Sequence, residues 1–268
     1  MRRFFRNPKG LLILVLGGLT SIAALGNGPA LVAPGLIAAV AIGMLIDAPI
    51  LRLRKGRWIF PDGALLTGLI VAMILTPQAP WQVAAFASAV GVMGKYFLRG
   101  RTANVYNPAA LGLLATYLAF HSGQSWWGAL PDLPVPTLEP AALGVLIITG
   151  LVIADRVHRL PATLAFLGGY YLLFTAMAFL GEPGNVAAIY RASDLHAAIF
   201  FAFFMVTDPP TSPSRDRDQI IFGLLVAIFS YTVFELNGAV YYLLAGLLGA
   251  NTWEAWRRQR VHAVRHAV

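Results

Sequence analysis

Continuous apolar segments recur along almost the whole chain, separated only by short polar or proline-containing breaks. In lipid, backbone N–H and C=O groups are satisfied only within helices or a closed barrel. Barrel strands alternate apolar and polar residues, whereas these segments are apolar throughout. The pattern predicts an all-α, polytopic transmembrane helical bundle in a single integral membrane domain, residues 1–268, with about ten helices over approximately residues 11–26, 31–50, 63–77, 81–98, 107–120, 140–157, 160–181, 195–208, 220–235 and 239–256.

The composition agrees with burial in a bilayer. The chain is 58% hydrophobic and 12% charged, whereas a soluble domain carries roughly 25% charged residues. Cysteine is absent, which excludes disulfides and an iron–sulfur cluster ligated by this chain. The histidines show no metal-ligand spacing, so the sequence predicts no metal site, and no pattern singles out a catalytic residue.

The basic residues set the expected orientation. Lys and Arg concentrate in cytoplasmic loops, and an N-terminus inside places all 20 of them except Arg191 on the inner side. Both termini are therefore predicted to be cytoplasmic. The net charge of +8 follows from this asymmetry and suits a lipid bilayer with anionic lipids, not a nucleic-acid partner. Tryptophans are expected at both interfaces, with Trp58, Trp253 and Trp256 inside and Trp81, Trp126 and Trp127 outside.

Two segments, 94–115 and 203–227, are weakly alike. Each leaves an apolar run on the inner side, passes through a loop rich in Asn, Thr and Pro, and re-enters with a Leu-rich run. The likeness raises the hypothesis of an internal repeat.

Four charged residues lie at one depth, near the inner ends of predicted helices: Asp47, Asp62, Lys95 and Asp208. Charge within a membrane segment commonly marks a site or a pathway. The alternative is that such residues cap helices, pair with nearby arginines or extend to the interface. Capping is the favoured interpretation for Asp62, which precedes a predicted helix. Both interpretations stay open for Asp47 and Asp208.

Two inner loops carry unusual chemistry. Asn104 and Asn107 precede Pro108, which suits the first position of a helix. Asn107 can simply cap that helix, or the amides and free backbone N–H groups can face a polar ligand. The second loop reads Thr-Asp-Pro-Pro-Thr-Ser-Pro over residues 207–213. Its prolines make it stiff, and a site at Thr207 and Asp208 is a hypothesis.

These loops carry a resemblance to a known family. The segments VYNPAALGLL (105–114), FFMVTDPPTSP (203–213) and ADRVHRLPATLAFLGGYYLL (154–173) resemble the membrane-subunit family shared by the sodium-pumping NADH:quinone reductase and the Rnf electron-transport complex. The resemblance implies ten helices with both termini inside, a place in the bacterial inner membrane, ion transport coupled to electron transport, and other membrane electron-transfer subunits as partners.

The resemblance also implies flavin. Members carry FMN on the threonine of a Ser-Gly-Ala-Thr motif, and the member from the quinone reductase holds a noncovalent riboflavin near the Asn-Pro-Ala-Ala segment. By resemblance, Asn104, Asn107 and Pro108 are the best candidates for flavin contacts, with Thr207 and Asp208 second. The threonine motif is replaced, since residues 121–126 read His-Ser-Gly-Gln-Ser-Trp. Covalent FMN is therefore not expected, and any flavin should be noncovalent riboflavin or FMN.

Three hypotheses of function follow from the sequence. The first is a flavin-binding subunit that works in electron transport with redox partners. The second is a transporter or channel for a small solute or a flavin, which uses the same scaffold without redox chemistry. The third is a structural membrane subunit that docks a partner.

Overall fold

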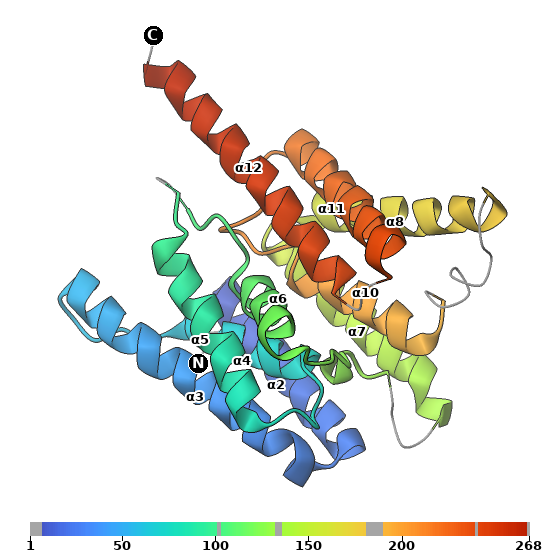
Figure 1. Ribbon diagram of the computed structural model, residues 1–268, viewed down its shortest axis with the longest axis horizontal. Coiled ribbons are helices and arrows are strands. Elements are labelled where there is room, and N and C mark those ends of the chain that lie inside the picture. Colours follow the sequence, from blue (N-terminus) through green and yellow to red (C-terminus); the bar gives the residue numbers. More distant parts are fainter. Residues whose placement is uncertain (1–6, 101–102, 132–135, 181–189, 239–240, 267–268) are drawn as a thin grey trace.

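The computed structural model describes residues 7–100, 103–131, 136–180, 190–238 and 241–266 (Figure 1). Within these ranges the chain forms ten α-helices and two 3-10 turns, with no strand beyond two isolated β-bridges. The elements are α2 (Pro8–Asn27), α3 (Pro29–Lys55), α4 (Asp62–Ile74), α5 (Trp81–Phe97), α6 (Pro108–Phe120), η1 (Trp127–Ala129), η2 (Pro136–Leu138), α7 (Glu139–Arg156), α8 (Leu160–Leu180), α10 (Ala192–Phe204), α11 (Asp216–Asn237) and α12 (Tyr242–His266). The predicted all-α bundle of about ten helices is confirmed.

The helices fall into two halves with the same packing pattern (Figure 1). In the first half α5 packs against α3 and α6, and α4 packs against α2. In the second half α11 packs against α8 and α12, and α10 packs against α7. Each helix of the first half thus corresponds to the helix five places later in the chain, so that the pair α5 and α6 is equivalent to the pair α11 and α12. The loops 94–115 and 203–227, which suggested a repeat, therefore do not occupy equivalent positions.

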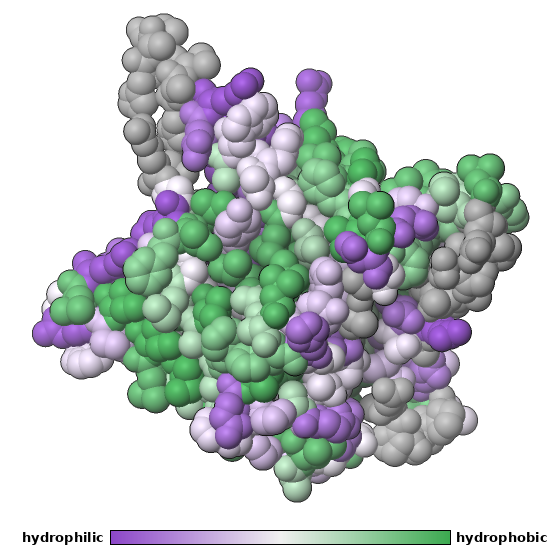
Figure 2. All heavy atoms as spheres, in the orientation of Figure 1, coloured by the Kyte–Doolittle hydropathy of each residue, from purple (hydrophilic) through white to green (hydrophobic). Residues whose placement is uncertain are grey.

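Among the described residues, four helices are long and apolar enough, by length and composition, to cross a membrane: α2, α3, α8 and α11. The third helix of each half is shorter, because α4 and α10 have 13 residues each. At 1.5 Å per residue such a helix rises about 20 Å, which is less than the roughly 30 Å hydrocarbon core. Large apolar side chains such as Leu45 and Leu172, which are 68% and 71% exposed, point out of the bundle. Figure 2 shows apolar side chains covering much of the face formed by the first half.

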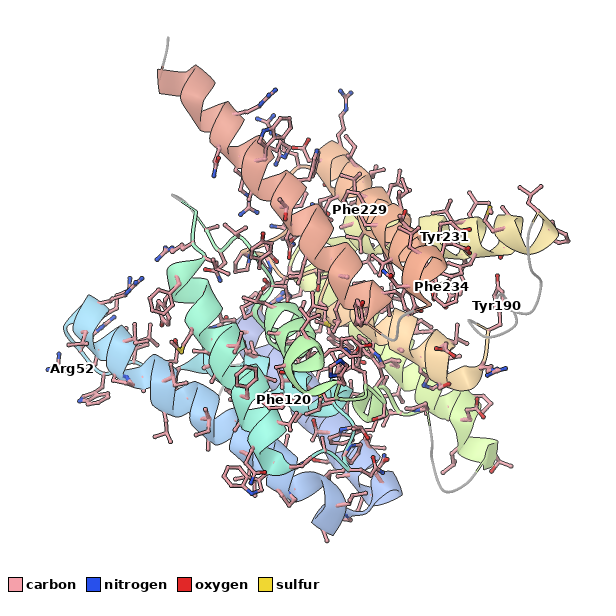
Figure 3. The ribbon with its side chains drawn as sticks, viewed as in Figure 1. Arg52, Phe120, Tyr190, Phe229, Tyr231 and Phe234 are labelled. Carbon is pink, nitrogen blue, oxygen red and sulfur yellow. The ribbon has the colours of Figure 1, made fainter. Side chains whose placement is uncertain are left out.

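The interior of the second half is rich in aromatic side chains. Tyr170 and Phe174 of α8 are fully buried and contact Tyr242 of α12. Tyr231 and Phe234 of α11 point toward this cluster and meet the Phe174 ring edge to face (Figure 3). Aromatic pairs of this kind add stabilisation beyond their buried area. They join α8, α11 and α12 into one unit.

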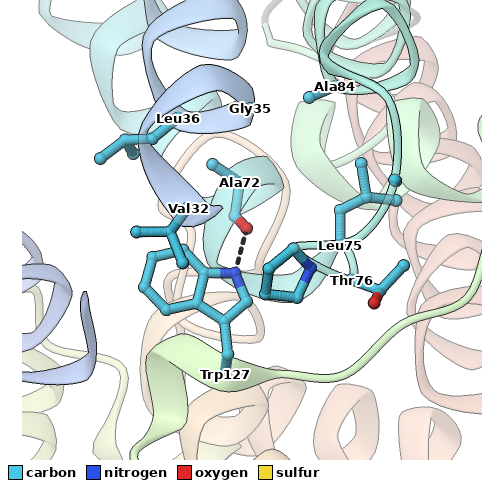
Figure 4. A pocket seen from close by; sticks show the side chains of 10 residues that line it. Val32, Gly35, Leu36, Ala72, Leu75, Thr76, Ala84 and Trp127 are labelled. Atoms are coloured by element: carbon cyan, nitrogen blue, oxygen red, sulfur yellow. Dashed lines mark hydrogen bonds between the residues drawn. The ribbon is translucent and has the colours of Figure 1, made fainter. Parts of the chain in front are cut away.

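The end of α4 differs from the predicted helix over 63–77. The helix stops at Ile74, and Leu75 adopts an extended conformation. The last carbonyls of a helix lack partners within it, and here a later segment supplies them. The backbone N–H groups of Ser125 and Trp126 donate to the Ile74 carbonyl at 2.9 and 3.1 Å. The Trp127 indole donates to the Ala72 carbonyl at 2.6 Å (Figure 4). This re-entrant segment closes the end of the short helix.

The same segment corrects the expectation that Trp126 and Trp127 lie in the outer aromatic belt. Their side chains are 7% and 2% exposed, because they fill the bundle beyond α4. Trp58 and Trp81 are 72% and 52% exposed, as interface residues would be. Hydropathy does not separate these two environments, since both place a tryptophan beside an apolar run.

Three other predicted boundaries are corrected. The helix expected over 195–208 ends at Phe204, because Asp208 precedes Pro209 and the residue before proline disfavours helical geometry. The helix expected over 31–50 continues to Lys55 and ends at Gly56, whose positive φ of 70° suits a glycine cap. The helix expected over 239–256 begins at Tyr242 and runs to His266 as a polar extension.

Close contact between α5 and α6 predicts that Gly112 is intolerant of a side chain. A Cβ at this position would lie 2.0 Å from the Ala87 carbonyl oxygen. Gly112→Val should lower the thermal unfolding temperature in detergent. Overpacking of this kind typically lowers the free energy of unfolding by about 1–3 kcal/mol. Gly144→Val is the matched control, because nothing lies within 4 Å of a Cβ there. Equal loss in both variants would contradict the close contact.

Candidate functional site

A cavity of about 620 Å³ lies where α2, α4 and α6 begin and where α3, α5, α7 and α10 end. Its walls combine apolar side chains with several polar and charged groups. The apolar lining includes Leu12, Leu51, Leu66, Ile70, Ile153, Val157 and Phe204. The polar lining includes Lys9, Asp47, Asp62, Thr67, Lys95, Asn104, Asn107, Thr207 and Asp208.

All five predicted site residues line this one cavity. Asn104, Asn107 and Pro108 come from the segment that leads into α6, and Thr207 and Asp208 follow α10. The structure therefore brings together two loops that are about a hundred residues apart in sequence. The other charged residues noted at one depth, Asp47, Asp62 and Lys95, line the same cavity.

Asn107 is the centre of a hydrogen-bond network that fixes the cavity wall. Its side-chain oxygen accepts from the Ala110 N–H at 3.1 Å, which confirms that Asn107 caps α6. Its side-chain nitrogen donates to the Met205 carbonyl at 3.3 Å, and its backbone N–H donates to the side-chain oxygen of Asn251 at 3.0 Å. Asn251 in turn donates to the Thr211 carbonyl at 3.2 Å. The Asn107 amide is therefore engaged by protein groups.

The loop after α10 folds into a tight turn. The Thr207 hydroxyl donates to the Phe203 carbonyl at 2.6 Å. The Asp208 carbonyl accepts from the backbone N–H groups of Thr211 and Ser212 at 3.1 and 3.0 Å and from the Ser212 hydroxyl at 2.8 Å. The Thr211 hydroxyl donates to one Asp208 carboxylate oxygen, Oδ2, at 2.8 Å. The loop is stiff, as its prolines predict.

Two arginines tie this turn to neighbouring helices. Arg258 of α12 donates to the carbonyls of Pro210 and Ser212 at 2.7 and 2.9 Å. Its guanidinium is held by the buried carboxylate of Glu254 at 2.7 Å. Arg159, just before α8, donates to the Ser212 hydroxyl at 2.9 Å. The sequence assigned both arginines to the inner-side charge pattern and did not foresee these contacts.

Two ion pairs line the cavity. Asp47, whose side chain is 2% exposed, lies 2.5 Å from the Lys95 ammonium and also accepts a hydrogen bond from the Tyr96 hydroxyl. Asp62 pairs with Lys9 at 2.9 Å. The expectation that Asp62 caps α4 is wrong, since Asp62 is the first helical residue and Pro61 occupies the cap position. No sequence pattern had singled out Lys9, because it was counted with the basic residues that set orientation.

Two polar side chains in the wall keep hydrogen-bonding capacity. The Asn104 amide makes no hydrogen bond to any residue that the structure describes, and it lines the cavity. Asp208 has one bonded carboxylate oxygen, and its second oxygen makes no hydrogen bond to the described residues. Burial raises the pKa of Asp208 to about 6, although the Thr211 hydrogen bond and the charges of Lys9, Arg159 and Arg258 act to lower it.

The loop at residues 121–131 lies on the far side of the bundle from this cavity. The pocket beside Trp127, lined also by Val32, Leu36 and Ala84, has a volume of about 10 Å³ (Figure 4). That volume admits about one water molecule. The pocket is too small for a flavin ring.

Comparison with known proteins places the chain in a family. The NQR2, RnfD, RnfE family matches residues 9–134 and 126–248, and the chain belongs to this family. A relative from Pseudomonas paraeruginosa, named as one subunit of an ion-translocating oxidoreductase complex, is 27% identical over 84% of this chain and 83% of its own length. Proteins of the same name from Klebsiella pneumoniae and Salmonella newport are 24% and 23% identical, over 76% and 85% of this chain and 78% and 85% of their own lengths. The chain is thus a multi-pass membrane protein of an electron-transport subunit family.

The two asparagines of the cavity should differ in their effect on stability. Asn107→Ala removes the helix cap and the bond to the Met205 carbonyl, so it should destabilise the protein by about 1–3 kcal/mol. Asn104→Ala removes no hydrogen bond to the residues that the structure describes, and it should leave thermal unfolding in detergent nearly unchanged. Similar unfolding temperatures for the two variants would contradict the network.

The raised pKa of Asp208 predicts a pH-dependent stability. The folded protein holds a proton on Asp208 up to about pH 6, whereas an unfolded aspartate releases it near pH 3.9. Ionisation of Asp208 therefore lowers the free energy of unfolding of the protein as pH rises from about 4 to about 6, by up to about 3 kcal/mol. Asp208→Asn should be more stable than the wild type at pH 7.5 and nearly equal to it at pH 4. A difference that is independent of pH, measured by thermal unfolding, would refute the raised pKa.

Proposed function

We propose that this protein is the membrane-embedded subunit of an ion-translocating electron-transport complex of the bacterial inner membrane and that it binds a noncovalent flavin in the 620 Å³ cavity. The observation that carries the proposal is that both motif loops, around Asn104–Pro108 and Thr207–Asp208, line this cavity. Membership of the family and the names of its relatives support the membrane electron-transport role.

The cavity suits a ligand of the flavin class. Sites for small molecules and cofactors typically have volumes of about 300–1,000 Å³, mostly apolar walls and a few placed polar groups. Here the walls are largely apolar. The Asn104 amide, and the Asp208 oxygen that has no partner among the described residues, supply donors and acceptors. A flavin ring has two broad apolar faces and a polar edge, which match these two kinds of wall. When bound, flavin supplies one- and two-electron transfer.

The roles of the five candidate residues differ. Asn104 and Asp208 are proposed to contact the ligand directly, because each has a polar side-chain atom that makes no hydrogen bond to the described residues. Asn107, Thr207 and Pro108 are proposed to shape the wall, since the Asn107 amide and the Thr207 hydroxyl already bond to protein carbonyls. The buried pair of Asp47 and Lys95 holds α3 and α5 together beside the ligand.

We place the cavity on the cytoplasmic side with both termini inside. Basic residues gather at this end, where Lys9 and Lys95 line the cavity and Arg159 and Arg258 hold the adjacent turn. Such a concentration is typical of the cytoplasmic face. A single flavin at one end does not bridge a hydrocarbon core of about 30 Å, so other membrane electron-transfer subunits are proposed as partners.

A transporter for a small solute or a flavin is the second candidate. It is favoured by the five-helix repeat with a short third helix in each half, a feature of many transporters. Against it, the end of α4 opposite the cavity is filled by Met73, Trp126 and Trp127, which are all buried. The described residues thus form a cavity at one end of the bundle.

Purification of the full chain in detergent separates the two candidates. We expect flavin to co-purify and to be released on denaturation, as measured by absorbance and by mass. Asn104→Ala should lower flavin occupancy several-fold at unchanged thermal stability, because it removes a free amide from the wall. The matched control is Ser193→Ala, at the first turn of α10, away from the cavity.

Three outcomes would count against the proposal. Unchanged occupancy in Asn104→Ala would remove Asn104 from the site. Flavin that survives denaturation would show covalent attachment. A colourless protein that takes up labelled solute in liposomes would favour transport.

A further inference from the structure

Asp208 differs from the two other carboxylates of the cavity. Asp47 is neutralised by Lys95 at 2.5 Å and Asp62 by Lys9 at 2.9 Å. Asp208 lies within salt-bridge distance of no cation among the residues that the structure describes. One of its oxygens is bonded to the Thr211 hydroxyl, and the other is left without a partner in the described part of the chain. It is therefore the carboxylate of the cavity whose charge is not paired.

The surrounding turn fixes where this carboxylate lies. Pro209 and Pro210 follow it directly and restrict the backbone. The Asp208 carbonyl is used by Thr211 and Ser212, and Arg258 holds the Pro210 and Ser212 carbonyls. The turn thereby holds Asp208 in the lining of the cavity.

The charges that face Asp208 come from three elements. They are Lys9 at the start of α2, Arg159 before α8, and Arg258 of α12, whose guanidinium is itself neutralised by Glu254. Lys9 is likewise paired with Asp62, and Arg159 is engaged by Ser212 and by the Val157 and His158 carbonyls. Each cation thus has another partner. Burial outweighs their attraction and raises the pKa of Asp208 to about 6.

We propose that Asp208 is the proton-exchanging group of the cavity, which donates a proton to a flavin-class ligand on reduction and regains it from water. The inference rests on the proposed function, because it requires a redox-active ligand in the cavity. An acid matched to its task must be able to hold and release a proton near the working pH. Asp47 and Asp62 are instead held in ion pairs with Lys95 and Lys9.

Protons and electrons balance over one cycle of reduction and oxidation. Two electrons come from a reduced carrier of a partner subunit, and full reduction of the ring requires two protons. Asp208 gives up its carboxyl O–H proton as an N–H bond forms on the ring, and it becomes a carboxylate. Water supplies the second proton and then reprotonates Asp208. Return of both electrons to an oxidised carrier releases both ring protons.

The test uses the purified full chain loaded with flavin and reduced by dithionite in a stopped-flow instrument. The wild-type rate of reduction should fall as pH rises through the ionisation of Asp208. In Asp208→Asn the rate should be lower, by about 10²-fold or more as is typical for loss of a general acid, and should lose this pH dependence. Asp155→Asn is the control, because Asp155 is an exposed carboxylate at the same end outside the cavity.

A spectroscopic readout checks the assignment without turnover. A time-resolved infrared difference spectrum, recorded during reduction and before water reprotonates Asp208, should show loss of a carboxylic-acid C=O band in the wild type, and Asp208→Asn should lack this change. Thr211→Val removes the hydrogen bond that favours the ionised carboxylate, so it should move the pH profile upward. Thr211→Ser should restore the profile. This pair keeps the test decisive if Asp208→Asn fails to hold flavin.

The outcomes separate the two proposals. If the wild type binds flavin, but the rate of flavin reduction depends on pH in Asp208→Asn or in Thr211→Val as it does in the wild type, the role of Asp208 alone would be overturned. A wild-type protein that binds no flavin would overturn the proposed function and this inference together.

Discussion

The structure depends on how backbone groups are satisfied where two short helices end inside the bundle. A helix leaves its last carbonyls without internal partners, and lipid offers no donor to replace them. In the first half, the re-entrant segment 123–127 supplies backbone and indole N–H groups to the end of α4. In the second half, side chains supply the donors. The hydroxyls of Thr163 and Thr207 donate to carbonyls in the last turn of α10, and Asn107 and Arg258 donate to carbonyls of the segment that follows it. Backbone and indole N–H groups thus meet the end of α4, whereas side-chain donors meet the end of α10 and the turn after it.

This difference between the halves has a direct effect on where a ligand can bind. The segment 123–127, which meets the end of α4, also fills the space beyond that helix with the side chains of Trp126 and Trp127. At the end of α10 no comparable pair of aromatic side chains lines the space, and the described residues leave the cavity there. The two halves therefore share one packing pattern but differ at the ends of their short helices. The end of α4 is filled by aromatic side chains, whereas a cavity lies at the end of α10.

Local signals predicted part of the site, and non-local packing decided the rest. Pro108 with Asn107 identified the start of α6, and the prolines after Asp208 identified a stiff turn, because both signals act within a few residues. The meeting of these loops depends on Asn251, which lies in another helix and looks unremarkable in the sequence. The sequence positions of Lys9 and Arg258 indicate only membrane orientation, since charge alone does not reveal a bonding partner. Trp127 was misplaced because its partner, the Ala72 carbonyl, leaves no trace in the sequence.

The contacts of α12 have a mechanical consequence. Asn251 and Arg258 lie about two helical turns apart on one side of this helix, and both bond to the turn that follows α10. Beyond Arg258 the helix continues past the rest of the bundle (Figure 1). The same helix that projects from the bundle therefore contacts the cavity wall at two points, about two turns apart. A displacement of α12 would change the position of the turn that carries Asp208.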